Sequence, residues 1–127
     1  MTDALVERKA VPAAFRILAL AMPALIGGQV FLAGLAIFSD GSLWETHAAT
    51  GGALAVPLLG MVALAFLRLE LLRYRVSVLM LLGLHCLQFV FVIAGNGIGF
   101  IQALHPANAI AMTVVSVLLA RSVWTGG

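Results

Sequence analysis

Charged positions divide the chain into long apolar segments. No Asp, Glu, Lys or Arg occurs at 17–39, at 48–67 or at 76–120. A helix needs about 20 apolar residues to cross a hydrocarbon core about 30 Å thick, and the third segment is about twice that length. Glycines at 95, 97 and 99 interrupt this segment with turn-forming residues. The pattern predicts four membrane-spanning helices at 14–39, 47–69, 76–95 and 105–124.

The composition excludes a soluble fold. Of 127 residues, 63% are hydrophobic and 9% are charged, whereas about a quarter are charged in an ordinary soluble domain. A chain of this size cannot hide so much apolar surface from water, so membrane lipid is the expected solvent. We expect one transmembrane domain over residues 1–127. No basic cluster with interleaved aromatic residues occurs, which argues against nucleic acid as a partner.

The basic residues fall on one side of the predicted spans. They precede the first span, lie between the second and third, and close the fourth; they are Arg8, Lys9, Arg16, Arg68, Arg73, Arg75 and Arg121. Positive residues concentrate in cytoplasmic segments, so this side and both termini are expected in the cytoplasm. Short connections make successive spans antiparallel. The fold class is therefore all-α, an up-down-up-down four-helix bundle in a prokaryotic plasma membrane.

Prolines and glycines add local expectations. Pro23 and Pro57 fall inside predicted spans and should bend them, whereas Pro106 is placed in the first turn of the fourth span, where its missing N–H does no harm. Small residues at membrane depth favour close helix approach. The glycines expected to do this are Gly27, Gly28, Gly34, Gly51, Gly52 and Gly60.

Two histidines stand at matching positions near the outer surface. His47 opens the second predicted span and His105 opens the fourth. These spans are diagonal partners in an up-down bundle, so the two imidazoles can face each other across the axis with a flat cofactor between them. Gly51 and Ala109 each lie one turn beyond a histidine and leave room for a porphyrin. The arrangement predicts one haem b with His47 and His105 as axial ligands.

Other interpretations of this pair are kept open. Both histidines can be interfacial polar residues, with His105 acting as a local cap before Pro106. Another metal or a proton-linked role is a further alternative. Zinc is disfavoured, because no cysteine or paired carboxylates accompany them.

His85 is expected near the bilayer centre. Ionisable residues at that depth are costly and often mark function. Gln29 lies at comparable depth and Gln88 one turn away, so the sequence predicts a hydrogen-bonded polar pair inside the bundle. A quinone-binding or proton-linked site that uses Gln29 and His85 is the alternative.

Nearly the whole chain resembles one four-helix half of the heme A synthase family. The resemblance rests on Gly27-Gly28-Gln29 with Ala33-Gly34-Leu35, on Trp44-Glu45-Thr46-His47 with Gly51-Gly52, on Leu87-Gln88, and on Ala103-Leu104-His105 with Ala109. Each half in that family clamps a haem between histidines on its second and fourth helices. The resemblance therefore implies that His47 and His105 are the ligands, and it assigns no role to His85.

The chain departs from that family in ways that bear on activity. The family's catalytic half has a glutamate one turn before its ligand, whereas here Glu45 precedes His47 by two positions. Many family members have a pair of cysteines in an outer loop, whereas Cys86 is the single cysteine of this chain and lies in the third predicted span. Only one half is present. We therefore expect a small b-type cytochrome or subunit for electron transfer, acting as a homodimer or within a larger respiratory or redox complex, rather than a haem-hydroxylating enzyme. A non-catalytic accessory subunit is the competing class.

The outer side has no Lys or Arg to pair with haem propionates. The sequence instead offers neutral hydrogen-bonding groups near that surface. These are Trp44, Thr46, Asn96, Gln102 and Asn108.

Overall fold

The computed structural model describes residues 10–126, which are almost entirely helical and contain no strand. The elements are α1 (Ala13–Phe38), α2 (Leu43–Ala53), α3 (Ala55–Leu67), the 3-10 helix η1 (Leu69–Tyr74), α4 (Arg75–Ala94) and α5 (Gly99–Thr125). Four helical segments are long and apolar enough to cross a membrane: α1, α2 with α3, η1 with α4, and α5. The all-α prediction and the number of spans are confirmed.

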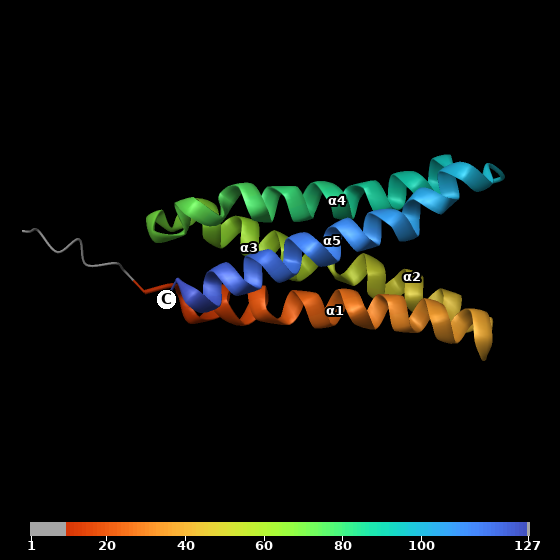
Figure 1. Cartoon of the computed structure of the whole chain (residues 1–127), viewed down its shortest axis with the longest axis horizontal. Helices are drawn as coiled ribbons and strands as arrows, with labels where there is room; N and C mark the ends of the chain where they lie inside the picture. The colour runs from red at the N-terminus through yellow and green to blue at the C-terminus, as the bar shows by residue number, and fades with distance from the viewer. Residues whose placement is uncertain (1–9, 127) are drawn as a thin grey trace, which may run out of the picture.

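Successive segments run antiparallel to each other (Figure 1). α1 packs against α2, α3 and α5, and α4 packs against α3 and α5. The second and fourth spans are therefore diagonal, as predicted. Both ends of the described chain lie at one end of the bundle (Figure 1). We call this the basic end, because it carries Arg16, Arg68, Arg73, Arg75 and Arg121; Arg8 and Lys9 lie outside the described residues.

The opposite end, here the loop end, holds connections shorter than predicted. α2 begins at Leu43 rather than at 47, and α5 begins at Gly99 rather than at 105. Of the glycines in the last connection, Gly97 alone has a positive φ, at 80°, and Gly99 is already helical. The placement of Pro106 in a first turn was therefore wrong. It lies inside α5, where its ring removes the helix bond to the carbonyl of Gln102.

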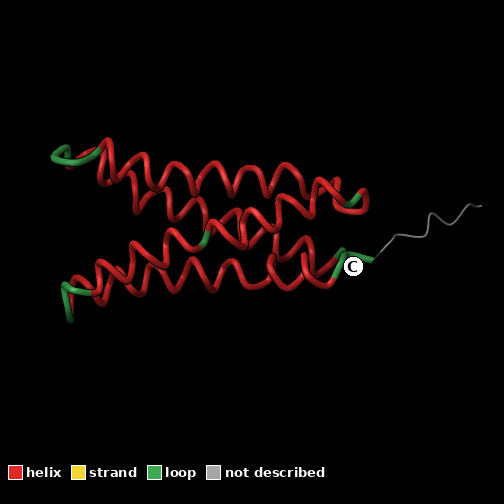
Figure 2. Tube along the Cα trace, turned by 180° about the vertical axis from the view of Figure 1, so that it is seen from behind, coloured by secondary structure: helices red, strands yellow, loops and turns green. Residues whose placement is uncertain are grey.

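Pro57 interrupts the second span as expected. The break falls at Leu54 between α2 and α3, because proline cannot donate to the carbonyl of Ala53. Figure 2 shows this break as a short non-helical segment in the middle of the bundle. Pro23, in contrast, lies inside α1, which continues through it.

The core fills the basic half of the bundle. Its residues recur every three or four positions along each helix, which is the seam of a left-handed bundle. Members of this seam include Phe15, Ala19, Met22, Leu58, Met61, Ala65, Leu71, Tyr74, Val78, Leu81, Leu119 and Val123. Toward the loop end the α1–α2 and α4–α5 hairpins diverge (Figure 1). The same face of each helix continues toward the loop end, but its residues there line an open space and do not pack against one another.

Most glycines expected at close helix contacts are not at contacts. A Cβ added at Gly27, Gly28, Gly34 or Gly52 would meet nothing within 4 Å, whereas one at Gly60 would touch Leu18 at 3.6 Å. The prediction of close approach was wrong for those four positions. The reason is that the hairpins diverge in this half of the bundle.

Candidate functional site

A cavity of about 1020 Å³ lies between the two hairpins in the loop half of the bundle. This volume is at the upper end of the range for small-molecule sites, about 300–1,000 Å³. All seven residues predicted to form the site line it: Gln29, His47, Gly51, His85, Gln88, His105 and Ala109. Among residues 10–126, no Asp, Glu, Lys or Arg lines this cavity.

The rings of His47 and His105 lie close together in the cavity, in an edge-on arrangement. Their ring centroids are 6.2 Å apart and their planes are inclined at 68°. His47 comes from the fifth position of α2, and His105 lies in the second turn of α5. The diagonal placement of the two spans thus brings the two imidazoles together, as the sequence predicts.

Each imidazole is held by a backbone carbonyl on the preceding span. Nδ1 of His47 lies 3.1 Å from the carbonyl oxygen of Gln29, and Nδ1 of His105 lies 3.1 Å from that of Gln88. A carbonyl accepts only, so Nδ1 must carry the proton and donate it. The lone pair is then on Nε2, and neither Nε2 makes a hydrogen bond within the described chain.

The separation of the rings suits a shared metal ion. A metal–imidazole bond is about 2.0–2.1 Å long and the ring centroid lies about 1.1 Å beyond the nitrogen, so two imidazoles on opposite sides of one ion have centroids about 6.3 Å apart. The observed 6.2 Å agrees with this distance. Carbonyl-bound Nδ1 atoms are also the usual outer support of metal-binding histidines.

Gly51 has a role that the sequence did not reveal. In the orientation that pairs both ends of its amide, Gln29 donates to the His47 carbonyl at 2.9 Å, with the same nitrogen 3.3 Å from Nδ1 of His47, and accepts from Thr50 Oγ1 at 2.6 Å and from the Gly51 N–H at 3.2 Å. A Cβ at Gly51 would lie 3.1 Å from the end of this amide. Gly51 therefore makes room for Gln29 as well as facing the cavity.

The predicted hydrogen-bonded pair at His85 does not form. His85 is only 5% exposed, yet its Nε2 is buried without a partner, as is Oε1 of Gln88. Gln29 bonds to α2 instead of to His85. The expectation was wrong because depth along neighbouring helices does not set side-chain direction: His85 packs edge-on against Phe89, with ring centroids 5.2 Å apart.

The neutral polar groups expected around a ligand divide into two sets. Trp44 and Gln102 line the cavity at the loop end. Asn108 is turned away and donates to the Leu84 carbonyl at 2.8 Å, and Thr46 and Asn96 do not line the cavity. Sequence reasoning missed the edge-on contact of Trp44 with His47, at 5.5 Å between centroids. The three-residue spacing from Trp44 to His47 could have indicated this contact.

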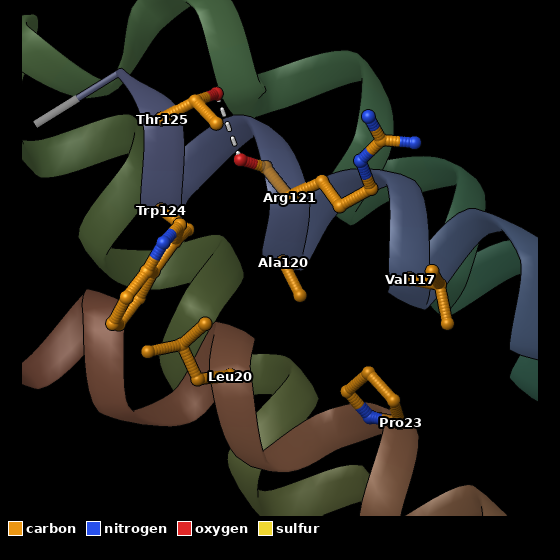
Figure 3. Close-up of a pocket in the computed structure, with 7 residues that line it drawn as sticks. All are labelled: Leu20, Pro23, Val117, Ala120, Arg121, Trp124 and Thr125. Atoms are coloured by element: carbon orange, nitrogen blue, oxygen red, sulfur yellow. Dashed lines mark hydrogen bonds between the residues drawn. The ribbon is translucent and has the colours of Figure 1, made fainter.

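A second, smaller cavity of about 290 Å³ lies near the basic end, between α1 and α5. Figure 3 shows Leu20, Pro23 and Trp124 around it, with the guanidinium of Arg121 directed away from Leu20 and Pro23. Thr125 donates to the carbonyl of Arg121 on its own helix at 2.9 Å. The groove is apolar and offers no polar group with evident chemistry.

Within residues 10–126, no group of three or more His, Cys, Asp or Glu side chains could share a metal ion. A zinc site of the usual four-ligand type is therefore not favoured. A metal ion that is already held by the equatorial ligands of a cofactor needs only two ligands from the protein, and the two imidazoles can supply these.

A family model described as a family of unknown function, DUF6220, matches residues 29–96, which is more than half of the chain. The matched region contains Gln29, His47, His85 and Gln88 and ends before His105. No curated protein and no solved structure matches the chain.

Proposed function

The chain belongs to the DUF6220 family of unknown function, and we propose that it is a membrane b-type cytochrome that binds one haem between His47 and His105. The observation that carries the proposal is the pair of imidazoles 6.2 Å apart in a large cavity. Each is held through Nδ1, so that both Nε2 atoms are free to ligate. The resemblance to one half of heme A synthase is consistent with the same two ligands.

The protein's own contribution is orientation. The carbonyls of Gln29 and Gln88 fix the tautomer and rotation of the two rings before any ligand arrives. Gly51 has no side chain and Ala109 has only a methyl group, so both leave room in the cavity beside the histidines. Haem held by two imidazoles supplies one-electron transfer, with no open position for oxygen.

The polarity of the cavity favours one direction for the haem. Gln102 and Trp44 line the loop end of the cavity, whereas Ile26, Leu54 and Met112 line the inner end. Propionates are costly to bury among apolar groups. The propionates therefore point toward the loop end.

The arginine distribution supports an orientation in the membrane. The basic end lies in the cytoplasm and the loop end faces outward, in a prokaryotic plasma membrane. The cavity then lies near the outer surface. Exposed apolar residues beside it, among them Val30 and Ile93, face lipid or a second protein. The protein works as a homodimer or within a larger redox complex.

The test is a haem titration of purified wild-type protein and three variants in mild detergent. The wild type takes up one haem per chain and gives low-spin bands, and His47→Ala and His105→Ala each lose them. His85→Phe serves as a control, because His85 is no ligand in this proposal. Loss of the low-spin bands in His85→Phe alone would reassign the ligands, and failure of the wild type to bind haem would refute the proposal.

A further inference from the structure

The α4 wall of the large cavity carries two polar side chains that the haem proposal does not use. His85 and Gln88 lie about one helical turn apart, on the same face of α4. Nε2 of His85 and Oε1 of Gln88 are both buried and have no hydrogen-bond partner in the described part of the chain. His85 has more than nine-tenths of its surface covered and still lines the cavity.

Two buried, unpaired atoms behind one cavity wall destabilise the fold, and no other described residue compensates for them. A buried donor or acceptor without a partner costs about 1–3 kcal/mol. Neighbouring helices offer nothing to either atom: Asn108 is committed to Leu84 and Gln29 to α2. Such atoms usually have a partner that is a water or a ligand.

The cavity restricts the kind of ligand. Within residues 10–126 no charged residue lines it, so a charged head group bound deep beside His85, unlike propionates at the loop end, would be buried without a counterion. Its walls include Val30, Ile110 and Val114, which are about half to two-thirds exposed. Such apolar walls within the membrane-spanning part of the chain suit a lipid-soluble ligand. The ligand is therefore neutral, lipid-soluble and able to both donate and accept hydrogen bonds.

We propose that His85 and Gln88 form a subsite for the head group of a lipid-soluble hydroquinone. A hydroquinone hydroxyl donates to Oε1 of Gln88, and a hydroxyl oxygen accepts from the protonated Nε2 of His85. The flat ring packs beside Phe89, which lines the same wall. Both polar atoms are shielded from solvent, so binding includes a rotation of each side chain toward the cavity that it already lines.

The hydroquinone form is preferred to the quinone. Oε1 of Gln88 accepts and cannot donate, so it gains a bond only from a ligand O–H. A quinone offers only carbonyl oxygens, which can accept from His85 or from the amide nitrogen of Gln88 but leave Oε1 of Gln88 without a donor. The subsite shares its cavity with the proposed haem, but its two side chains are not the axial ligands of the proposed function.

The experiment measures binding of a decyl-substituted benzohydroquinone to haem-free protein in detergent. Trp44 lines the cavity and Trp124 does not, so a Trp124→Phe background makes Trp44 fluorescence a reporter for this cavity. His85→Phe and Gln88→Leu each weaken binding by about tenfold to a hundredfold. His85→Gln keeps a donor and retains most of the affinity.

Matched controls separate the subsite from general partitioning. Thr113→Val removes a hydroxyl from the same cavity, but that hydroxyl already donates to the Ala109 carbonyl at 2.8 Å, so affinity stays unchanged. The dimethyl ether of the probe, which cannot donate, binds as weakly as the probe binds to Gln88→Leu. Equal binding of the probe to wild type, His85→Phe and Gln88→Leu overturns the proposal, as does equal binding of the ether and the probe to the wild type. Failure to bind haem leaves this result unaffected, because the protein is tested without it.

Discussion

Replacing Gly95 by alanine tests how the α4–α5 connection sets the position of His105. Gly95 follows α4, and a Cβ there would collide with the carbonyl of Phe91 and lie 2.8 Å from the backbone nitrogen of Gln102 and 2.9 Å from its Cγ. Gln102 lies in the first turn of α5, three residues before His105. Backbone atoms cannot rotate away, so the start of α5 must move relative to α4.

The size of the effect follows from the contacts. Inserting a methyl group into a fully packed site costs typically about 1–3 kcal/mol. Because two of the three contacts are to backbone, we expect a loss near the upper end of that range for Gly95→Ala. The displaced α5 also weakens the bond from Nδ1 of His105 to the Gln88 carbonyl, and outer-shell changes of this kind lower metal affinity by about 10–100-fold.

Gly99→Ala is the matched control. Gly99 belongs to the same connection, but a Cβ there would meet nothing within 4 Å, and alanine is the better helix former. Thermal unfolding followed by circular dichroism in detergent should show a lower midpoint for Gly95→Ala and an equal or higher one for Gly99→Ala. An equal midpoint for Gly95→Ala and Gly99→Ala would refute the inference that this turn is closely packed around Gly95.

Two further predictions concern the α1–α2 hairpin. Gly51→Val crowds the Gln29 amide, at 3.1 Å from a Cβ, and should lower haem affinity by about tenfold, whereas Gly52→Ala, with no neighbour, should leave it unchanged in the same titration. The Ser42 N–H bonds to Asp40 Oδ1 at 2.9 Å and, with the Ser42 hydroxyl, lowers the pKa of this exposed carboxyl. Because the pKa of Asp40 is lower in the folded than in the unfolded chain, its ionised carboxylate stabilises the fold at a pH above the unfolded pKa. This stabilisation is lost as the pH falls through the folded pKa. Ser42 has φ −65°, a value that proline can adopt. Ser42→Pro removes the N–H and should raise the pKa of Asp40, measured by NMR titration. An unchanged pKa of Asp40 would contradict this cause.

The sequence predicts the spans well because lipid makes apolar length a direct signal. Arg16 and Asp40 bound the first charge-free segment and Arg121 follows the last, and α1 and α5 begin or end near these charges. Helix starts were less accurate at the loop end. There, glycine allows a turn without requiring one, and only Gly97 takes the left-handed conformation.

The proximity of His47 and His105 is also predictable from the sequence, because it depends on where the spans begin and on which spans are diagonal. Both side chains lie on the seam that faces the bundle axis, and diagonal spans of equal direction bring equal depths together. The partners of the other polar side chains are not predictable in this way. Rotations of the Gln29 amide and the His85 ring decide them, and these depend on neighbours from other helices such as Thr50 and Phe89.

Electron paramagnetic resonance of the oxidised, purified protein tests the central claim most directly. Ferric haem between His47 and His105 gives one low-spin centre per chain, with the strong anisotropy expected from imidazole planes inclined at 68°. The signal must disappear in both His47→Ala and His105→Ala and persist in His85→Phe. A high-spin signal from haem-loaded wild-type protein, or a low-spin signal that survives loss of either histidine, would contradict the account.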